Sequence, residues 1–144
     1  MCHDAAVRLA CTPRSVRAAR TFVMDRLRGW GVAPTDVAHG RVADAVLVVS
    51  ELVGNAVKNC SQEVELRLVT HGDHIEVAVT DDNPEPAELK QPDPLTPGGR
   101  GLVLVDAIAE QWGQRRQAGH KTVWARLRVP PGSALATDCR LGAG

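Results

Sequence analysis

Residues 51–59 read ELVGNAVKN, and this segment decides the fold that the sequence predicts. Glu51 and Asn55 stand four residues apart, so in a helix they lie one above the other on the same face. Lys58 and Asn59 extend this polar face by another turn, while the valines of the helix lie on a different side. The segment therefore combines an acid, an amide and a base beside a buried seam.

The polar face of this helix has two interpretations. Asn55 could give Mg²⁺ a neutral oxygen ligand, because Mg²⁺ keeps several of its waters and takes few protein ligands. Glu51 could polarise an attacking hydroxyl or water. The simpler interpretation is a solvated helix face with a hydrogen bond between positions i and i+4, and the helix taken alone favours it.

Two helices are expected in the first part of the chain. The helix that carries the segment is expected from Thr35-Asp36 to about Asn59, with a buried stripe of valines at helical spacing. The members of this stripe are Val42, Val46, Val49, Val53 and Val57. An earlier helix is expected to begin at Thr12-Pro13, with Thr12 as its N-cap residue, and to end near Trp30. A short strand over Val7–Cys11 precedes it.

Residues after the central helix alternate between apolar and polar side chains, which predicts half-buried strands. One strand is expected around Val64–Leu68 and the next around Ile75–Val79, joined by a hairpin turn at residues 71–74. Residues 82–99 are polar and hold five of the nine prolines, which predicts a long loop that is either a functional lid or disordered. A short helix over Leu102–Ala109 and a last strand over Val123–Val129 follow.

This order of elements predicts one α+β domain. It is a two-layer sandwich in which a mixed, mostly antiparallel sheet carries its helices on one face. The domain is expected to span residues 1–130, with residues 131–144 as a flexible tail. A chain of 144 residues can bury a core of this kind without metals or disulfides.

Asp81 continues the alternation of Ile75, Val77 and Val79, which places its side chain on the buried side of the sheet. A buried carboxylate is costly unless it has a hydrogen-bond partner. A donor on a bound ligand, such as the amino group of adenine, would satisfy it. A role in capping the loop that follows the strand would satisfy it too, and the residues leave both interpretations open.

Gly98, Gly99, Arg100 and Gly101 stand at the start of the predicted short helix. Glycines let backbone N–H groups approach a phosphate, and a helix N-terminus favours anions. Arg100 would add positive charge there, although a solvated arginine explains it equally. The segment is not a P-loop, because no Gly-Lys-Ser/Thr follows, and it lacks the third glycine and the preceding strand of a dinucleotide-binding motif.

Bulk composition excludes some functions. Seventeen basic residues balance seventeen acidic ones, so charge gives no reason to expect nucleic acid or an anionic membrane as the main partner. No apolar run is long enough to span a bilayer. The cysteines at 2, 11, 60 and 139 have no C-x-x-C spacing, so no zinc site is expected. Because no signal peptide is recognisable, they are expected to be reduced thiols of a cytoplasmic protein.

The three motifs together resemble those of the GHKL ATPase superfamily, which includes gyrase and the histidine kinases. The matching segments are ELVGNAVKN at 51–59, VAVTDDNPEP at 77–86, GGRGLVLVDAIAEQWG at 98–113 and KTVWARL at 121–127. Their wording is most similar to the anti-sigma-factor serine kinase branch, in which E-L-V-x-N-A, D-x-x-P, G-G-R-G-L and K-T-V-W occur in this order. The resemblance covers most of the chain and implies the Bergerat fold.

The resemblance implies a role for each matching residue. Asn55 would ligate Mg²⁺, Glu51 would be the base or hydroxyl-orienting group, and Asp81 would bind the adenine amino group. The other expected nucleotide contacts are Gly99, Gly101 and Leu102 in the phosphate-side loop, Lys58 and Arg100 near the phosphates, and Thr122 at the adenine or its bridging water. Asn59 is a further expected nucleotide contact.

The function that the resemblance implies is an ATP- and Mg²⁺-binding anti-sigma factor that phosphorylates an antagonist protein on serine or threonine. Its partners would be a sigma factor and this antagonist, without direct nucleic-acid or membrane contact, and relatives often form homodimers. The alternative is a non-catalytic interaction module with weak or no nucleotide binding. It is motivated by Asn83 and Glu85, which replace the glycines of the superfamily motif D-x-G-x-G, and by the long predicted loop. A further departure is Asn59, which stands where many relatives carry histidine. A plain ATPase without a protein substrate ranks last.

Overall fold

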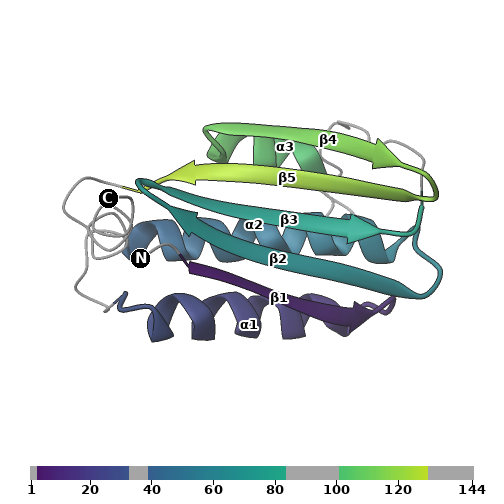
Figure 1. Ribbon diagram of the computed structural model, residues 1–144, viewed down its shortest axis with the longest axis horizontal. Helices are drawn as coiled ribbons and strands as arrows, with labels where there is room; N and C mark the ends of the chain where they lie inside the picture. Colours follow the sequence, from purple (N-terminus) through teal and green to yellow (C-terminus); the bar gives the residue numbers. More distant parts are fainter. Residues whose placement is uncertain (1–2, 33–38, 84–100, 130–144) are drawn as a thin grey trace.

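The computed structural model describes residues 3–32, 39–83 and 101–129, which form five strands and three helices (Figure 1). The strands are β1 (His3–Ala10), β2 (Glu63–His71), β3 (His74–Asp81), β4 (Gln111–Gln117) and β5 (His120–Arg128). The helices are α1 (Ser15–Gly29), α2 (His39–Val57) and α3 (Gly101–Ile108). Several predicted features lie outside the described residues. They are the start of the central helix at Thr35-Asp36, most of the predicted loop, Gly99, Arg100 and the predicted tail. No helix in the described ranges is long and apolar enough to cross a membrane.

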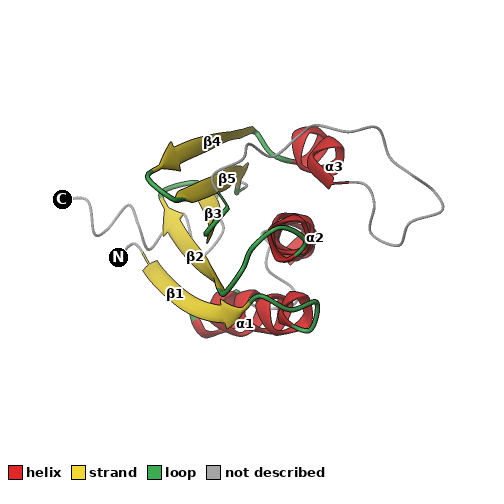
Figure 2. Cartoon of the chain, turned by 90° about the vertical axis from the view of Figure 1, so that its right-hand side faces the viewer, coloured by secondary structure: helices red, strands yellow, loops and turns green. Residues whose placement is uncertain are grey.

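The five strands form one sheet in the order β1-β2-β3-β5-β4. All four pairings among these strands are antiparallel. Figure 2 shows the sheet on one side of the molecule and the three helices on the other. This arrangement confirms the predicted α+β sandwich with its helices on one face. Of the one or two closing strands that the sequence predicts, the structure has two, β4 and β5.

The hydrophobic core fills the space between the sheet and the helices. Alternate residues of β2, β3 and β5 are buried, which confirms the predicted alternation. Their apolar members are Val64, Leu66, Leu68, Ile75, Val77, Val79, Val123, Ala125 and Leu127. The β2–β3 hairpin turns at Gly72, whose φ of 61° is the left-handed conformation that glycine adopts without strain.

The buried side of α2 is broader than the predicted valine stripe. Val49 and Val53 are buried as predicted, but Val42, Val46 and Val57 are only half-buried. The other buried positions are Ala45, Val48, Leu52 and Ala56. Because α2 packs against α1, α3 and the sheet at once, two adjacent positions are enclosed in each of its two central turns, and the seam is rotated from the predicted one.

The start of α1 differs from the prediction. Thr12 is not the N-cap residue, because α1 begins at Ser15 and its N-cap position, Arg14, makes no side-chain capping hydrogen bond. The Ser15 hydroxyl instead donates to the carbonyl of Ala10 at 2.6 Å. This contact joins the first residue of α1 to the last residue of β1, so the helix start is fixed by the strand rather than by a local cap.

Cys11 and Cys60 form a disulfide across this junction, with Cα atoms 6.0 Å apart and a sequence separation of 49 residues. The expectation of reduced thiols is therefore wrong for these two cysteines, while Cys2 and Cys139 lie outside the described residues. The pairing of β1 with β2 brings them together, since the Cys11 N–H donates to the carbonyl of Gln62 at 3.0 Å. The disulfide follows from strand register, which cysteine spacing alone does not reveal.

Candidate functional site

The polar residues of α2 gather at its C-terminal end. Glu51 and Asn55 are half-buried in the last two turns of the helix, as their spacing predicts. The helix ends at Val57, so the exposed Lys58 and Asn59 lie in the following turn and not on a further helical turn. The Asn59 side-chain amide donates to the carbonyl of Asn55 at 3.3 Å and satisfies one of the free carbonyls of the helix end.

Asp81 is the last residue of β3 and is only 2% exposed. Its side chain points to the helix-covered face of the sheet, as the alternation predicts. Oδ1 accepts a hydrogen bond from the N–H of Asn83 at 2.8 Å. Oδ2 lies 3.6 Å from Nζ of Lys121 on β5. Burial raises the pKa of Asp81, and both the Asn83 N–H and the Lys121 charge oppose this rise.

Lys121 also lies in the candidate site, although the motifs do not predict it there. It stands directly opposite Asp81 in the pairing of β3 with β5 and is itself 2% exposed. The signal was available, because Lys121 alternates with the buried residues Val123 and Ala125. The rule that placed Asp81 on the inner face of β3 places Lys121 on the inner face of β5.

Thr122, by contrast, lies on the outer face of the sheet. Its Oγ1 atom is 2.7 Å from Oγ1 of Thr80, its cross-strand partner. Thr122 and Asp81 therefore point to opposite faces, and the structure does not bring them together. The β5 side chain beside Asp81 is that of Lys121.

Asp82 joins the end of β3 to the loop that follows α2. Its two carboxylate oxygens accept hydrogen bonds from the N–H of Ser61 at 2.7 Å and of Gln62 at 2.9 Å. These hydrogen bonds hold the pKa of Asp82 below its usual range. They also fix the strand end that carries Asp81 close to the loop that leaves the polar end of α2.

Acid is expected to weaken this junction through Asp82. Because its folded pKa is lowered, its contribution to stability is complete above the unfolded pKa of about 3.9 and is lost as the pH falls through the folded pKa. Asp82→Asn should be less stable at neutral pH, since an amide offers one acceptor oxygen instead of two. Its stability should also fall less steeply between about pH 5 and about pH 2 than that of the wild type.

Urea unfolding at a series of pH values measures both effects. Asp25→Asn is the matched control, because Asp25 is exposed on α1, and it should follow the wild-type pH dependence. Parallel curves for wild type and Asp82→Asn would show that Asp82 does not link folding to pH.

The helix predicted after the glycine-rich segment is confirmed as α3, which begins at Gly101 and packs against α2. Leu102, the second residue of α3, is 2% exposed and belongs to the hydrophobic core. Its side chain therefore holds α3 on the core, and the nucleotide contact expected of Leu102 stays a prediction. Gly99 and Arg100 lie outside the described residues, so the phosphate-side loop stays a prediction.

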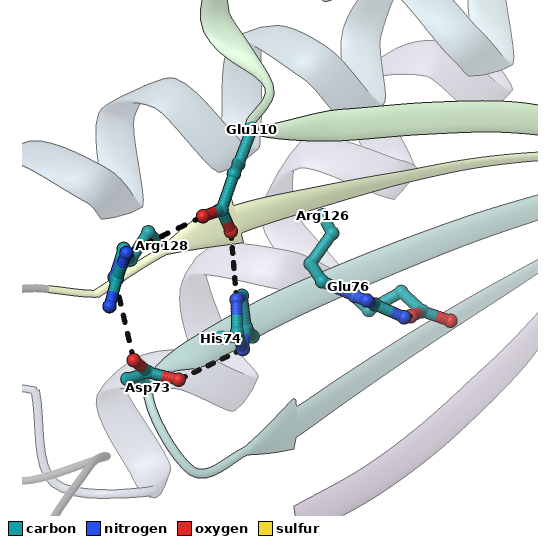
Figure 3. Close-up of polar contacts among 6 residues, drawn as sticks. All are labelled: Asp73, His74, Glu76, Glu110, Arg126 and Arg128. Carbon is teal, nitrogen blue, oxygen red and sulfur yellow. Dashed lines mark hydrogen bonds and ion pairs between the residues drawn. The ribbon is translucent and has the colours of Figure 1, made fainter.

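A second polar cluster lies at the other end of β3 (Figure 3). The two ring nitrogens of His74 lie 2.9 Å from Asp73 and 2.8 Å from Glu110. Arg128 is 3.5 Å from Asp73 and 3.6 Å from Glu110, which closes a ring of four side chains. His74 and Asp81 are the two ends of β3, so this cluster is separate from the candidate site. It joins the β2–β3 turn to the connection between α3 and β4.

Comparisons with known proteins agree with this geometry. The family model of the histidine kinase-like ATPase domain matches residues 9–127. The chain belongs to the histidine kinase-like ATPase domain family. The match to this family includes the polar end of α2, the Asp81–Lys121 pair and α3. A search of curated proteins gave no significant match.

Solved structures show the same fold. Among those that match is the crystal structure of the RsbU and RsbW domains of Rv1364c from Mycobacterium tuberculosis, with a TM-score of 0.65 and 21% sequence identity. The match covers 88% of this chain and 32% of that one, so the histidine kinase-like ATPase domain described here spans about a third of that protein's length.

Proposed function

We propose that the chain binds ATP with Mg²⁺ and is an anti-sigma factor that phosphorylates an antagonist protein on serine or threonine. One observation carries the proposal: the carboxylate of Asp81, which is 2% exposed, ends β3 on the helix-covered face, and the adjacent Asp82 is hydrogen-bonded to the loop that follows α2. The membership of the histidine kinase-like ATPase domain family supports nucleotide binding. The finer assignment, including a sigma factor and an antagonist as partners, rests on the residues of the four motifs and their order in the chain.

The donors and acceptors of the site fit this ligand. Each carboxylate oxygen of Asp81 has one partner among the described residues. A carboxylate oxygen can accept about two hydrogen bonds, so beside these partners capacity remains for the adenine amino group. Asn55 would hold Mg²⁺ through its side-chain oxygen. No group of three His, Cys, Asp or Glu side chains suited to a metal occurs in the three described ranges. Because Mg²⁺ keeps several waters and takes few protein ligands, its remaining ligands would be phosphate oxygens and water.

Glu51 would act on the protein substrate. Its carboxylate would accept the proton of the serine or threonine hydroxyl as that oxygen bonds to the terminal phosphorus, and ADP would leave. ATP would supply the phosphoryl group in this reaction, and bound Mg²⁺ would supply positive charge against the phosphates. Lys58, which is exposed just beyond α2, and the glycine-rich segment before α3 would contact the phosphates.

Calorimetric titration with ATP, with and without Mg²⁺, tests the binding site. The wild type should bind saturably, and Asp81→Asn should bind about 10- to 100-fold more weakly, because its amide group can turn a donor toward the adenine amino group. Asn55→Ala should lose the Mg²⁺ dependence. Asp25→Asn, a change of the same chemistry on the exposed side of α1, should bind like the wild type. Equal binding by wild type and Asp81→Asn would reject the assigned role of Asp81.

Phosphate transfer from ATP to a partner protein tests Glu51. Glu51→Ala is expected to lower the transfer rate about 10²- to 10⁴-fold, because the base is lost, while ATP affinity changes little. Glu65→Ala removes a carboxylate from β2 and should leave transfer unchanged. Equal transfer by the wild type and Glu51→Ala would remove Glu51 from the proposed mechanism.

One observation favours a second function. Both oxygens of Asp81 already have partners, Asn83 and Lys121, so the buried carboxylate is satisfied without any ligand. A non-catalytic interaction module, which uses the same fold only for protein contacts, would have this property. If the folded wild type does not bind ATP at millimolar concentration, the result would favour the interaction module over the kinase.

A further inference from the structure

The strongest unexplained feature of the molecule is the pairing of Asp81 with Lys121 below the surface. Among residues 3–32, 39–83 and 101–129, these two are the only charged residues that are buried, each at 2% exposure. Their strands place them directly opposite one another, and Nζ of Lys121 lies 3.6 Å from Oδ2 of Asp81. Buried charges are costly unless they are paired, and a buried pair is not by itself a gain in stability. A role in ligand binding would explain why the pair is present.

The charge state of Asp81 decides which hydrogen bond it can offer. An ionised carboxylate only accepts hydrogen bonds, whereas a protonated one also donates. Burial favours the protonated form, and a neighbouring cation favours the ionised form. Lys121 is therefore positioned to decide whether Asp81 presents an acceptor or a donor.

Within the described part of the chain, the other charged groups around Asp81 do not supply this cation at its carboxylate. Asp82, next in the chain, is an anion and raises the pKa of Asp81 further. On the neighbouring strand β2 the residue opposite Asp81 is the apolar Val64. The charged residues at the polar end of α2 are Glu51 and the exposed Lys58. On β4, the exposed Arg116 lies opposite Lys121 rather than opposite Asp81.

We propose that Lys121 is a specificity-determining positioning residue, which keeps Asp81 a pure hydrogen-bond acceptor and so selects a purine with an amino group at position 6 over one with a carbonyl there. This inference rests on the proposed ATP site. ATP and ITP differ at that edge of the base, because ATP presents an amino donor where ITP presents a carbonyl acceptor. An ionised Asp81 accepts a hydrogen bond from the amino group of ATP and repels the carbonyl oxygen of ITP. A protonated Asp81 can donate a hydrogen bond to that carbonyl oxygen.

Dissociation constants for ATP and ITP, measured by calorimetry from about pH 6 to about pH 8.5, test the proposal. The wild type should prefer ATP by about 100-fold or more. Lys121→Met, which keeps an unbranched side chain only one atom shorter and removes the charge, should lower this preference at least about tenfold. Its ATP affinity should also weaken with acid at a higher pH than that of the wild type, because Asp81 then takes up a proton more readily.

Two control variants separate charge from packing. Lys121→Arg restores a cation and should recover the wild-type preference and pH profile. Arg115→Met removes a cation from the exposed outer face of β4 and should change neither. If Lys121→Met has the same ratio of ITP to ATP affinity as the wild type, the proposal for Lys121 is overturned. ATP binding by the wild type would in that case still support the proposed function.

A measurement on the wild type keeps the proposal testable if Lys121→Met does not fold. The carboxyl carbon of Asp81, followed by ¹³C NMR in the ligand-free protein, should report an ionised group throughout the neutral range. A protonated Asp81 at neutral pH would overturn the proposal. A wild type that binds neither nucleotide would overturn the proposed function and this inference together, whatever the NMR result.

Discussion

Replacing Cys11 and Cys60 together by serine is expected to lower the free energy of unfolding by about 4 kcal/mol. The disulfide closes a loop with a sequence separation of 49 residues, which contains α1 and α2. Without it the unfolded chain regains the conformational freedom that this closure removes, so the unfolded state is favoured. Denaturant unfolding followed by tryptophan fluorescence would show a large shift of the midpoint to lower denaturant concentration.

A reducing agent provides the control for this change. Reduction should move the wild type to about the midpoint of the double variant, and it should leave the variant where it is. A thiol titration would verify that reduction is complete. If the fully reduced wild type keeps its midpoint, the disulfide does not contribute the expected stability.

Leu68→Ala is expected to lower the free energy of unfolding by about 2–5 kcal/mol. Leu68 is fully buried in β2, between Ala5 of β1 and Val77 of β3. Truncation removes buried apolar surface and leaves a cavity that surrounding strands can fill only in part. Equilibrium unfolding in urea, with the slope of the transition compared between the two proteins, measures the change.

Leu47→Ala is the matched control, because Leu47 is 41% exposed on α2. The same chemical change there is expected to alter stability by no more than about 0.5 kcal/mol. Similar losses for both variants would mean that Leu68 does not lie in the central core. A large loss for Leu68→Ala alone would support the sheet register described above.

The elements that the sequence predicts well are those that depend on local periodicity. Alternation is a property of neighbouring residues, so β2, β3 and β5 and the inward direction of Asp81 follow from it. The segment QWGQRRQ of β4 has no such alternation, and its pairing with β5 makes it a strand. Gly113 illustrates how closely β4 packs on β5, since a Cβ atom there would lie 2.8 Å from the indole of Trp124 on β5.

The features that could not be predicted depend on contacts between distant parts of the chain. The Cys11–Cys60 disulfide and the hydrogen bonds of Asp82 to Ser61 and Gln62 both require the sheet to be assembled. The wrong N-cap at Thr12 has the same cause, because Ser15 is held by the end of β1. The role expected of Thr122 has another origin, because it follows from the motif alone. The alternation of side chains along β5 places Thr122 on the outer face of the sheet and Lys121 on the inner face.

The loop between α2 and β2 is held at both of its sides before any ligand arrives. Cys60 is bonded to Cys11, and the next two residues donate their N–H groups to Asp82. A loop restrained in this way has already lost most of its conformational entropy on folding. A ligand that binds beside Asp81 would contact a loop that is already ordered. Little of its binding free energy would therefore be lost in ordering this part of the protein.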